Sequence, residues 1–203
     1  MPTGSYSPAF DAHITRKYSV GSLEHKIQNK TALQEEIGWP AEPKRPLVCL
    51  PAGMTDALGG PLFKEILAGL LTQPVELLVL GKGSTGYGTL FTQLATQEPH
   101  RVHIVQNEEH ATRRMYAAAD MALFLSDVPI KELTHCLAYG AVPLSLPQAL
   151  LENYDPVQET GNSFLYDKPT VWHAFSALVR AMETYKFPFD WRTIQRHAME
   201  SVR

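Results

Sequence analysis

Six short and almost wholly apolar runs are spaced along the chain, and they predict six buried strands. Near-continuous apolar runs of this length are typical of strands that are covered on both faces of a sheet. The runs are residues 46–50, 75–80, 101–106, 121–125, 141–146 and 162–166.

Between these runs, apolar residues recur at the three- and four-residue spacing of amphipathic helices. Such helices are predicted over residues 62–71, 108–118 and 130–139, and a further apolar stripe follows the last strand. The members of this stripe are Val171, Trp172, Phe175, Leu178, Val179 and Met182. Because strands and helices alternate, the predicted fold class is α/β, with a Rossmann-like, doubly wound parallel sheet.

Two more helices are expected at the ends of this pattern. The first covers residues 22–38, begins near Ser22 and is stopped by Gly38 and Pro40, and the last lies near residues 191–201. Residues 1–20 contain Pro and Ser without regular spacing, so we interpret them as an irregular linker that precedes one domain, residues 21–203. A chain of 203 residues is long enough for that domain to bury its own core.

The composition is that of an ordinary globular protein, with 44% hydrophobic and 19% charged residues. A net charge of −3 favours neither nucleic acid nor an anionic membrane as partner. Cys49 and Cys136 both lie in apolar segments, which indicates buried free thiols in a reducing compartment. No apolar run approaches the roughly 20 residues of a membrane span, and residues 1–7 lack a signal-peptide pattern. We therefore expect a cytoplasmic protein.

In open parallel sheets, ligands bind beyond the carboxyl ends of the strands, so the loops 51–60, 81–88, 106–110 and 126–132 are of most interest. Glycines in residues 81–86 permit close approach of the backbone to a phosphate or a base, although a flexible strand–helix turn explains them equally well. Lys82 is the only cation of that loop. Asp127 is placed to bind a ribose hydroxyl pair, with a solvated loop as the alternative.

The other residues that could take part in binding or catalysis are better explained by structural roles. Thr55 and Asp56 are predicted to cap the helix that follows them, and Arg113 and Arg114 to lie on a solvated helix face. His100 and His103 are expected on opposite faces of one strand, and no histidine spacing matches a metal site. No G-x-S-x-G or C-x-x-C motif occurs. We therefore predict no metal site.

Residues 6–40 carry a pattern that is specific to one family. They resemble the stretch N-P-x-x-D, I, K-Y, L-x-x-K-x-x-N-K-x-x-L-Q-x-x-x-G-L-P of bacterial glycogen synthases and plant starch synthases. The matching residues are Pro8, Asp11, Ile14, Lys17, Tyr18, Leu23, Lys26, Asn29, Lys30, Leu33, Gln34, Gly38 and Pro40. Residues 54–56 resemble L-T-D, residues 116–120 resemble Y-A-G-A-D and residues 139–143 resemble Y-G-T-V-P. Residues 191–199 resemble a W-x-x-x-x-x-x-x-M near the family's end, so the resemblance extends over roughly residues 6–199.

The resemblance implies the C-terminal, sugar-nucleotide-binding half of a GT-B glycosyltransferase, with the N-terminal domain absent. The family transfers glucose from ADP-glucose to an α-1,4-glucan with retention of configuration. It implies a nucleotide ligand near Gly81, Gly83, Asn107, Asp127 and Thr134, with no catalytic residue carried over to this chain. It implies no cofactor, and ADP-glucose only as a weakly bound donor.

The chain departs from the family at donor-binding positions. The arginine of S-R-L-T-D falls on Gly53, the lysine of D-Q-K-G on Leu58, and the aromatic residue that stacks on the base near Asn107. The glutamate of E-P-C-G falls on Pro129 in one alignment and on Asp127 in another. The G-G-L loop falls on residues 147–150, which contain no glycine.

Two functions remain open on this pattern. One is the donor-binding half of a divergent synthase that a separate N-terminal domain completes. The other is a non-catalytic binding or scaffold domain that contacts α-glucan or a protein partner. Because each charge-assisted hydrogen bond contributes about 1.5–3 kcal/mol, the lost cations predict a dissociation constant for a nucleotide sugar of roughly millimolar or weaker.

Overall fold

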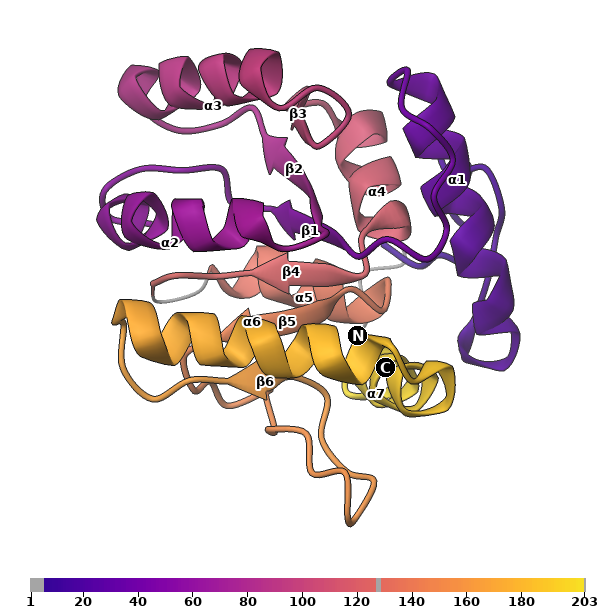
Figure 1. Ribbon diagram of the computed structural model, residues 1–203. Coiled ribbons are helices and arrows are strands. Elements are labelled where there is room, and N and C mark those ends of the chain that lie inside the picture. The colour runs from indigo at the N-terminus through magenta and orange to yellow at the C-terminus, as the bar shows by residue number, and fades with distance from the viewer. Residues whose placement is uncertain (1–5, 127–128, 203) are drawn as a thin grey trace.

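The computed structural model describes residues 6–126 and 129–202. Its centre is a parallel sheet of six strands in the order β3-β2-β1-β4-β5-β6 (Figure 1), which confirms the predicted doubly wound fold. Each strand lies within one of the six predicted runs. The strands are β1 (Leu47–Leu50), β2 (Glu76–Leu80), β3 (Val102–Val105), β4 (Met121–Leu123), β5 (Val142–Ser145) and β6 (Phe164–Leu165).

Side chains alternate between two hydrophobic clusters, one on each face of the sheet. In β1, Val48 and Leu50 belong to one cluster, whereas Leu47 and Cys49 belong to the other. The first face is covered by α2 (Gly60–Thr72), α3 (Thr85–Gln97) and α6 (Val171–Tyr185). The second is covered by α4 (Glu109–Ala118), α5 (Ile130–Ala138) and, outside α4, by α1 (Lys26–Glu36) (Figure 1). The last helix, α7 (Pro188–Glu200), contributes to both clusters.

Helix α6 turns a different face to the sheet than its sequence predicted. Trp172 is 82% exposed and Val179 is also exposed, so the prediction that both lie in the buried stripe was wrong. The buried stripe instead contains Ala174, Ala177 and Ala181 beside Leu178. Trp172 and Val179 lie roughly 100–120° round the helix from Leu178. Small alanine side chains let the helix approach its neighbours closely, and the hydrophobic pattern alone does not show this.

The N-terminal helix is shorter than predicted. A 3-10 turn, η1 (Val20–His25), precedes α1, and Ser22 inside it has the non-helical φ of −142°. The predicted helix over residues 22–38 is therefore correct only from Lys26 to Glu36. Gly38 ends it with a φ of +77°, the left-handed conformation that glycine adopts readily after a helix.

The predicted linker, residues 1–20, is described from Tyr6 onward, and no helix or strand occurs in its described part before Val20. Two of its side chains are nevertheless buried. Asp11 accepts a hydrogen bond from Tyr139 and pairs with Arg113 at 3.4 Å, and the Tyr18 hydroxyl donates to the Tyr139 carbonyl at 2.7 Å. This segment therefore packs on α4 and the end of α5.

His100 and His103 do not lie on the same strand. His100 lies in the turn before β3 with a φ of +63°, so only His103 is on the strand, and the expected placement of both on one strand was wrong. Within the described ranges, the structure contains no helix with the length and apolar character that a membrane span requires.

Candidate functional site

The loops that follow β1 and β2 are joined to each other by their backbones. The Met54 N–H donates to the Lys82 carbonyl at 3.1 Å, and the Ser84 N–H donates to the Met54 carbonyl at 3.2 Å. Both loops lie at the carboxyl edge of the sheet, on the left of Figure 1, where ligands of doubly wound folds bind.

Two glycines permit this close approach. Gly53 has a φ of +71°, and a Cβ atom there would lie 1.9 Å from the Lys82 carbonyl oxygen. Gly83 has a φ of +134°, and its Cβ would lie 2.0 Å from the Met54 carbonyl oxygen. Any side chain at either position therefore requires the two loops to separate. An arginine at position 53, the identity that the resemblance implies, does not fit this arrangement.

Replacing Gly53 with alanine should lower the free energy of unfolding by about 2 kcal/mol, because the left-handed backbone is strained for alanine and the new methyl group meets a carbonyl. Gly86→Ala is the matched control, since no atom lies within 4 Å of its Cβ position in α3. That variant should be neutral or slightly stabilising. Urea denaturation of both variants measures the difference, and equal stabilities would contradict the described loop contact.

Five of the nine backbone N–H groups of residues 51–60 are used within the chain. They donate to carbonyl oxygens of the loop or its neighbours and belong to Gly53, Met54, Leu58, Gly59 and Gly60. A phosphate at such a turn is held by aimed N–H groups or by cations. The loop 51–60 also contains no Lys or Arg, and it contains the carboxylate of Asp56.

Asp56 and Thr55 do not cap α2, so that prediction was wrong. The N-cap is Gly59, with a φ of +88°. The Thr55 hydroxyl accepts a hydrogen bond from Leu58 N–H at 3.2 Å. Asp56 accepts one from the Tyr87 hydroxyl at 2.6 Å, and burial together with this carboxylate raises the pKa of Tyr87 to about 12.

At the switch point of the sheet, between β1 and β4, the described residues enclose a small pocket. Among the described residues, the space between the two following loops has a volume of about 10 Å³, which is about enough for one water molecule. Gly59 approaches the end of β4 so closely that a Cβ there would lie 2.6 Å from the Leu125 carbonyl oxygen. This pocket is too small for a nucleotide sugar.

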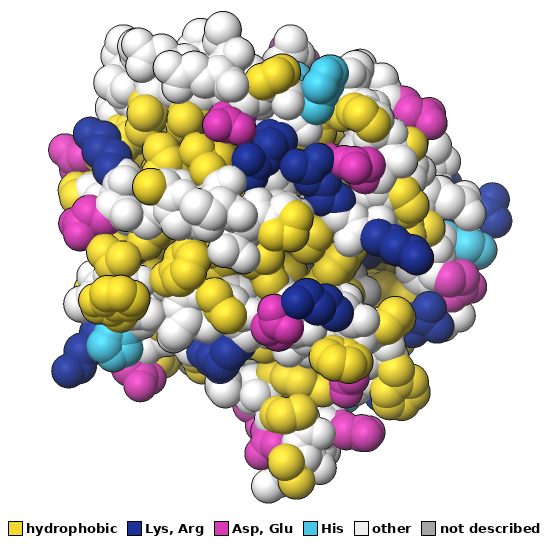
Figure 2. All heavy atoms as spheres, in the orientation of Figure 1, with side chains coloured by type: hydrophobic (Ala, Val, Ile, Leu, Met, Phe, Trp, Pro, Cys, Tyr) yellow, Lys and Arg dark blue, Asp and Glu magenta, His cyan; other side chains and the backbone are white. Residues whose placement is uncertain are grey.

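A larger cavity, of about 600 Å³, lies between α3 and the strands β2 and β3. Gly81 and Gly83 belong to its wall, together with Thr85, Gly88 and Thr92 of α3 and Ile104 of β3. In Figure 2, a hydrophobic area separates the mostly white surface of α3 from the helix below it. The cavity therefore offers hydroxyl groups on one side and apolar side chains on the other.

The structure brings only part of the predicted nucleotide site together. Gly81 and Gly83 share the wall of the 600 Å³ cavity, but Asn107 and Thr134 are not among the described residues that line it. The Thr134 hydroxyl donates to the Ile130 carbonyl at 2.7 Å, within its own helix. Asp127 lies outside the described residues.

Sequence reasoning missed one signal in the loop after β2. Its glycines at 81, 83 and 86 occupy the first, third and sixth positions of the dinucleotide pattern G-x-G-x-x-G, between a strand and a helix. Lys82, the cation of this loop, lies 3.9 Å from Glu132 Oε1 in the first turn of α5. Its charge therefore already faces a carboxylate of the chain.

Arg113 was predicted to lie on a solvated face, and this was wrong because the residue is buried. Its guanidinium pairs with Glu109 at 2.6 Å and with Asp11 at 3.4 Å, and it lies 4.0 Å from the centre of the Tyr6 ring. Arg114 pairs with Glu36 at 2.6 Å. Both arginines thus face carboxylates of the chain itself. The described ranges contain no group of three or more His, Cys, Asp or Glu that could hold a metal ion.

Comparison with known proteins identifies the relatives of this chain. No model of a protein family matches it. Glycogen synthase 1 of Synechocystis is 30% identical over an alignment of 209 positions, which covers 99% of this chain and 44% of that protein. The glycogen synthase of Gloeobacter violaceus is 31% identical over an alignment of 207 positions, which covers 98% of this chain and 45% of that protein. The chain is homologous to the C-terminal portion of glycogen synthase.

Solved structures agree with this glycogen synthase homology at the level of the fold. The catalytic domain of starch synthase IV from Arabidopsis thaliana, solved with ADP and acarbose, matches with a TM-score of 0.80 at 21% identity, over 96% of this chain and 42% of that one. The C-terminal domain of a group 1 glycosyl transferase from Francisella tularensis matches with a TM-score of 0.62 at 12% identity, over 88% of this chain and 91% of that one. The fold is thus the Rossmann-like fold of one domain of its GT-B glycosyltransferase neighbours, and the chain spans about half the length of the curated relatives that it matches.

Proposed function

We propose that this chain is a glycogen synthase donor domain whose nucleotide-sugar site has been lost at the switch point of the sheet. The observation that carries the proposal is the pairing of the loops after β1 and β2 through Met54, Lys82 and Ser84. This pairing engages the N–H and C=O groups of Met54, and the pocket beside it has a volume of about 10 Å³. In this proposal the scaffold is retained, while the loop after β1 no longer offers the groups that bind the donor diphosphate.

The charges near these loops support the same proposal. The leaving group of an ADP-glucose reaction is a diphosphate, so cations aimed at it stabilise the transition state. Here the loop 51–60 presents Asp56 and no cation, and Lys82 faces Glu132 at 3.9 Å. An incoming diphosphate would meet one carboxylate and compete with another for Lys82.

Residual binding of a nucleotide sugar, or of an α-glucan, is proposed for the 600 Å³ cavity under α3. Gly81 and Gly83 are already part of its wall, and Lys82 lines it as well. The affinity there is expected to be low. Asn107 and Thr134 are not among the described residues that line this cavity, so together with Asp127 they remain predicted contacts of a nucleotide at the neighbouring loops.

A non-catalytic binding or scaffold role is the second function that we propose. Trp172, at 82% exposure, and the exposed Ile130 are large apolar side chains that the fold leaves uncovered. The partner in this proposal is a protein or a separate N-terminal domain. We also propose residues 1–20 as a linker to such a domain, and a cytoplasmic location, which the buried free thiols of Cys49 and Cys136 support.

The chain alone should transfer no glucose from ADP-glucose to glycogen, because donor and acceptor are not positioned together. Addition of the separately produced N-terminal half of Synechocystis glycogen synthase should not restore transfer, since the donor site itself is lost. The assay measures incorporation of radiolabelled glucose into glycogen. The intact Synechocystis protein serves as the reference. Incorporation above the blank by the chain, alone or in the mixture, would refute the proposal.

A further inference from the structure

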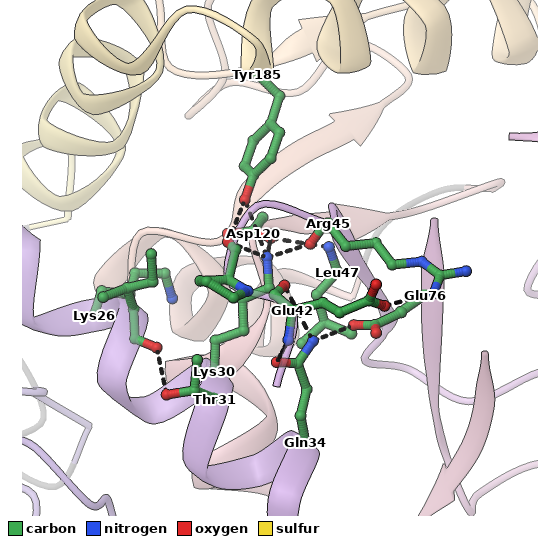
Figure 3. Close-up of polar contacts among 12 residues, drawn as sticks. Lys26, Lys30, Thr31, Gln34, Glu42, Arg45, Leu47, Glu76, Asp120 and Tyr185 are labelled. Atoms are coloured by element: carbon green, nitrogen blue, oxygen red, sulfur yellow. Dashed lines mark hydrogen bonds and ion pairs between the residues drawn. The ribbon is translucent and has the colours of Figure 1, made fainter. Parts of the chain in front are cut away.

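A buried polar network lies at the amino end of the sheet, at the opposite edge from the loops described above (Figure 3). Glu76, the first residue of β2, is completely buried there. It faces α1 and the connection between α1 and β1, residues 37–46. A carboxyl group in such a place requires hydrogen-bond donors or a proton of its own.

The hydrogen bonds of Glu76 are incomplete. Gln34 of α1 donates from Nε2 to Glu76 Oε2 at 2.6 Å. Glu76 Oε1 has no hydrogen-bond partner among the described residues, and neither has the buried Nε of Arg45. The rest of the Arg45 guanidinium is directed to Glu42, with 2.7 Å between Nη1 and Oε2. One buried acceptor and one buried donor are thus left over in the same cluster.

The nearest cations offset the burial of Glu76 only in part, because Lys30 and Arg45 lower its pKa but each is also paired with another carboxylate. Lys30 of α1 donates to Asp120 at 2.7 Å, so its charge has a carboxylate partner. Arg45 pairs with Glu42, whose own negative charge opposes ionisation of Glu76. The hydroxyl of Tyr185, from α6, is bound to Lys30 at 3.0 Å. These are the titratable groups that surround Glu76 from α1, the α1–β1 connection, the start of β4 and α6.

We propose that Glu76 is a proton-operated latch, whose neutral carboxyl group fixes α1 and the α1–β1 connection against the sheet and whose ionisation loosens them. The neutral acid carries no buried charge, and its O–H group needs a single acceptor. The ionised form needs a second donor at Oε1. Arg45 Nε or water can supply it only if the connection moves.

The pH range of this latch lies around neutrality. Burial raises the pKa of Glu76 from its ordinary value of 4.5 to about 7, although the hydrogen bond from Gln34 opposes the shift. Because the folded state binds this proton more tightly than the unfolded state, the native contact is strongest below about pH 5. It is weakened progressively as the pH rises to about 7 and stays weak above that.

The test compares the wild-type chain with Glu76→Gln, which is neutral at every pH, in urea denaturation between pH 5 and pH 8. The unfolding equilibrium constant of the wild type, divided by that of the variant, should rise roughly 50- to 100-fold over this range. Glu35→Gln is the matched control. Glu35 is exposed on the same helix, and this variant should show no such change relative to the wild type.

Hydrogen exchange shows whether the loosening is local. Above pH 7, the amides of α1 should lose protection in the wild type relative to Glu76→Gln, whereas the amides of α2 that exchange by local opening, without global unfolding, should not. Equal loss at these α2 amides, or a constant stability ratio from pH 5 to pH 8, would overturn the proposal. If Glu76→Gln does not fold, the carboxyl carbon of Glu76 in the wild type is titrated by NMR. A midpoint near pH 7 supports the latch, and one near 4.5 contradicts it.

Discussion

Replacing Asp120 with alanine is expected to lower the free energy of unfolding by about 3–5 kcal/mol, because it leaves a buried ammonium group without its counter-charge. Asp120 Oδ2 accepts hydrogen bonds from Lys30 Nζ at 2.7 Å and from the Leu47 N–H at 2.9 Å. The Lys30 side chain is only 2% exposed. Figure 3 shows that this pair joins α1, the start of β1 and the residue before β4, with Tyr185 approaching from α6.

The size of this effect depends on burial, which an exposed pair of the same geometry can test. Lys186 and Glu183 are also 2.7 Å apart, but their side chains are 63% and 62% exposed. Glu183→Ala should therefore change the stability by less than about 1 kcal/mol. The double variant Lys30→Met with Asp120→Ala should recover part of the loss, because no unpaired charge remains. An Asp120→Ala loss below 1 kcal/mol, measured by urea denaturation, would contradict this account.

The sheet was predictable because its strands are buried on both faces. Residues 75–80 are apolar except for Glu76, and such a run has few alternatives to a central strand. The position of Trp172 was not predictable in the same way. A helix with apolar residues on more than half of its circumference does not reveal which stripe packs, and here three alanines decided it.

The family was recognisable from residues 6–40, but the physical role of the matching residues was not. Asp11, Tyr18, Lys26 and Lys30 are all buried and bind groups more than 80 residues away in the chain. Lys26, for example, donates to the carbonyls of Tyr116 and Ala117 at the end of α4, at 3.0 and 2.9 Å. These contacts join segments that no local pattern connects.

The candidate site was predictable only as a set of loops. That the loop 51–60 lacks cations is visible in the sequence. Its contact with the loop after β2 depends on a tertiary approach between Gly53 and Lys82, which are 29 positions apart in the numbering. Glycine permits such an approach, but its presence in the sequence does not predict one, because glycine is also common in open turns.

Loss of the donor site is also expected to weaken the binding of nucleotide sugars strongly. Each charge-assisted hydrogen bond that a diphosphate loses weakens binding by about 1.5–3 kcal/mol, and the loop 51–60 presents no cation to form one. Two such losses together correspond to roughly 100-fold or more in affinity. Micromolar binding is therefore not expected for this chain.

The most direct measurement is a calorimetric titration of the chain with ADP and with ADP-glucose, with the intact Synechocystis glycogen synthase titrated in parallel as a reference. A competition arm with inorganic diphosphate separates binding of the phosphates from binding of the rest of the nucleotide. The account predicts a dissociation constant of roughly 1 mM or weaker for both ligands. A micromolar dissociation constant for ADP-glucose that diphosphate competes away would contradict it, because the loops after β1 and β2 would then have to open and bind the donor.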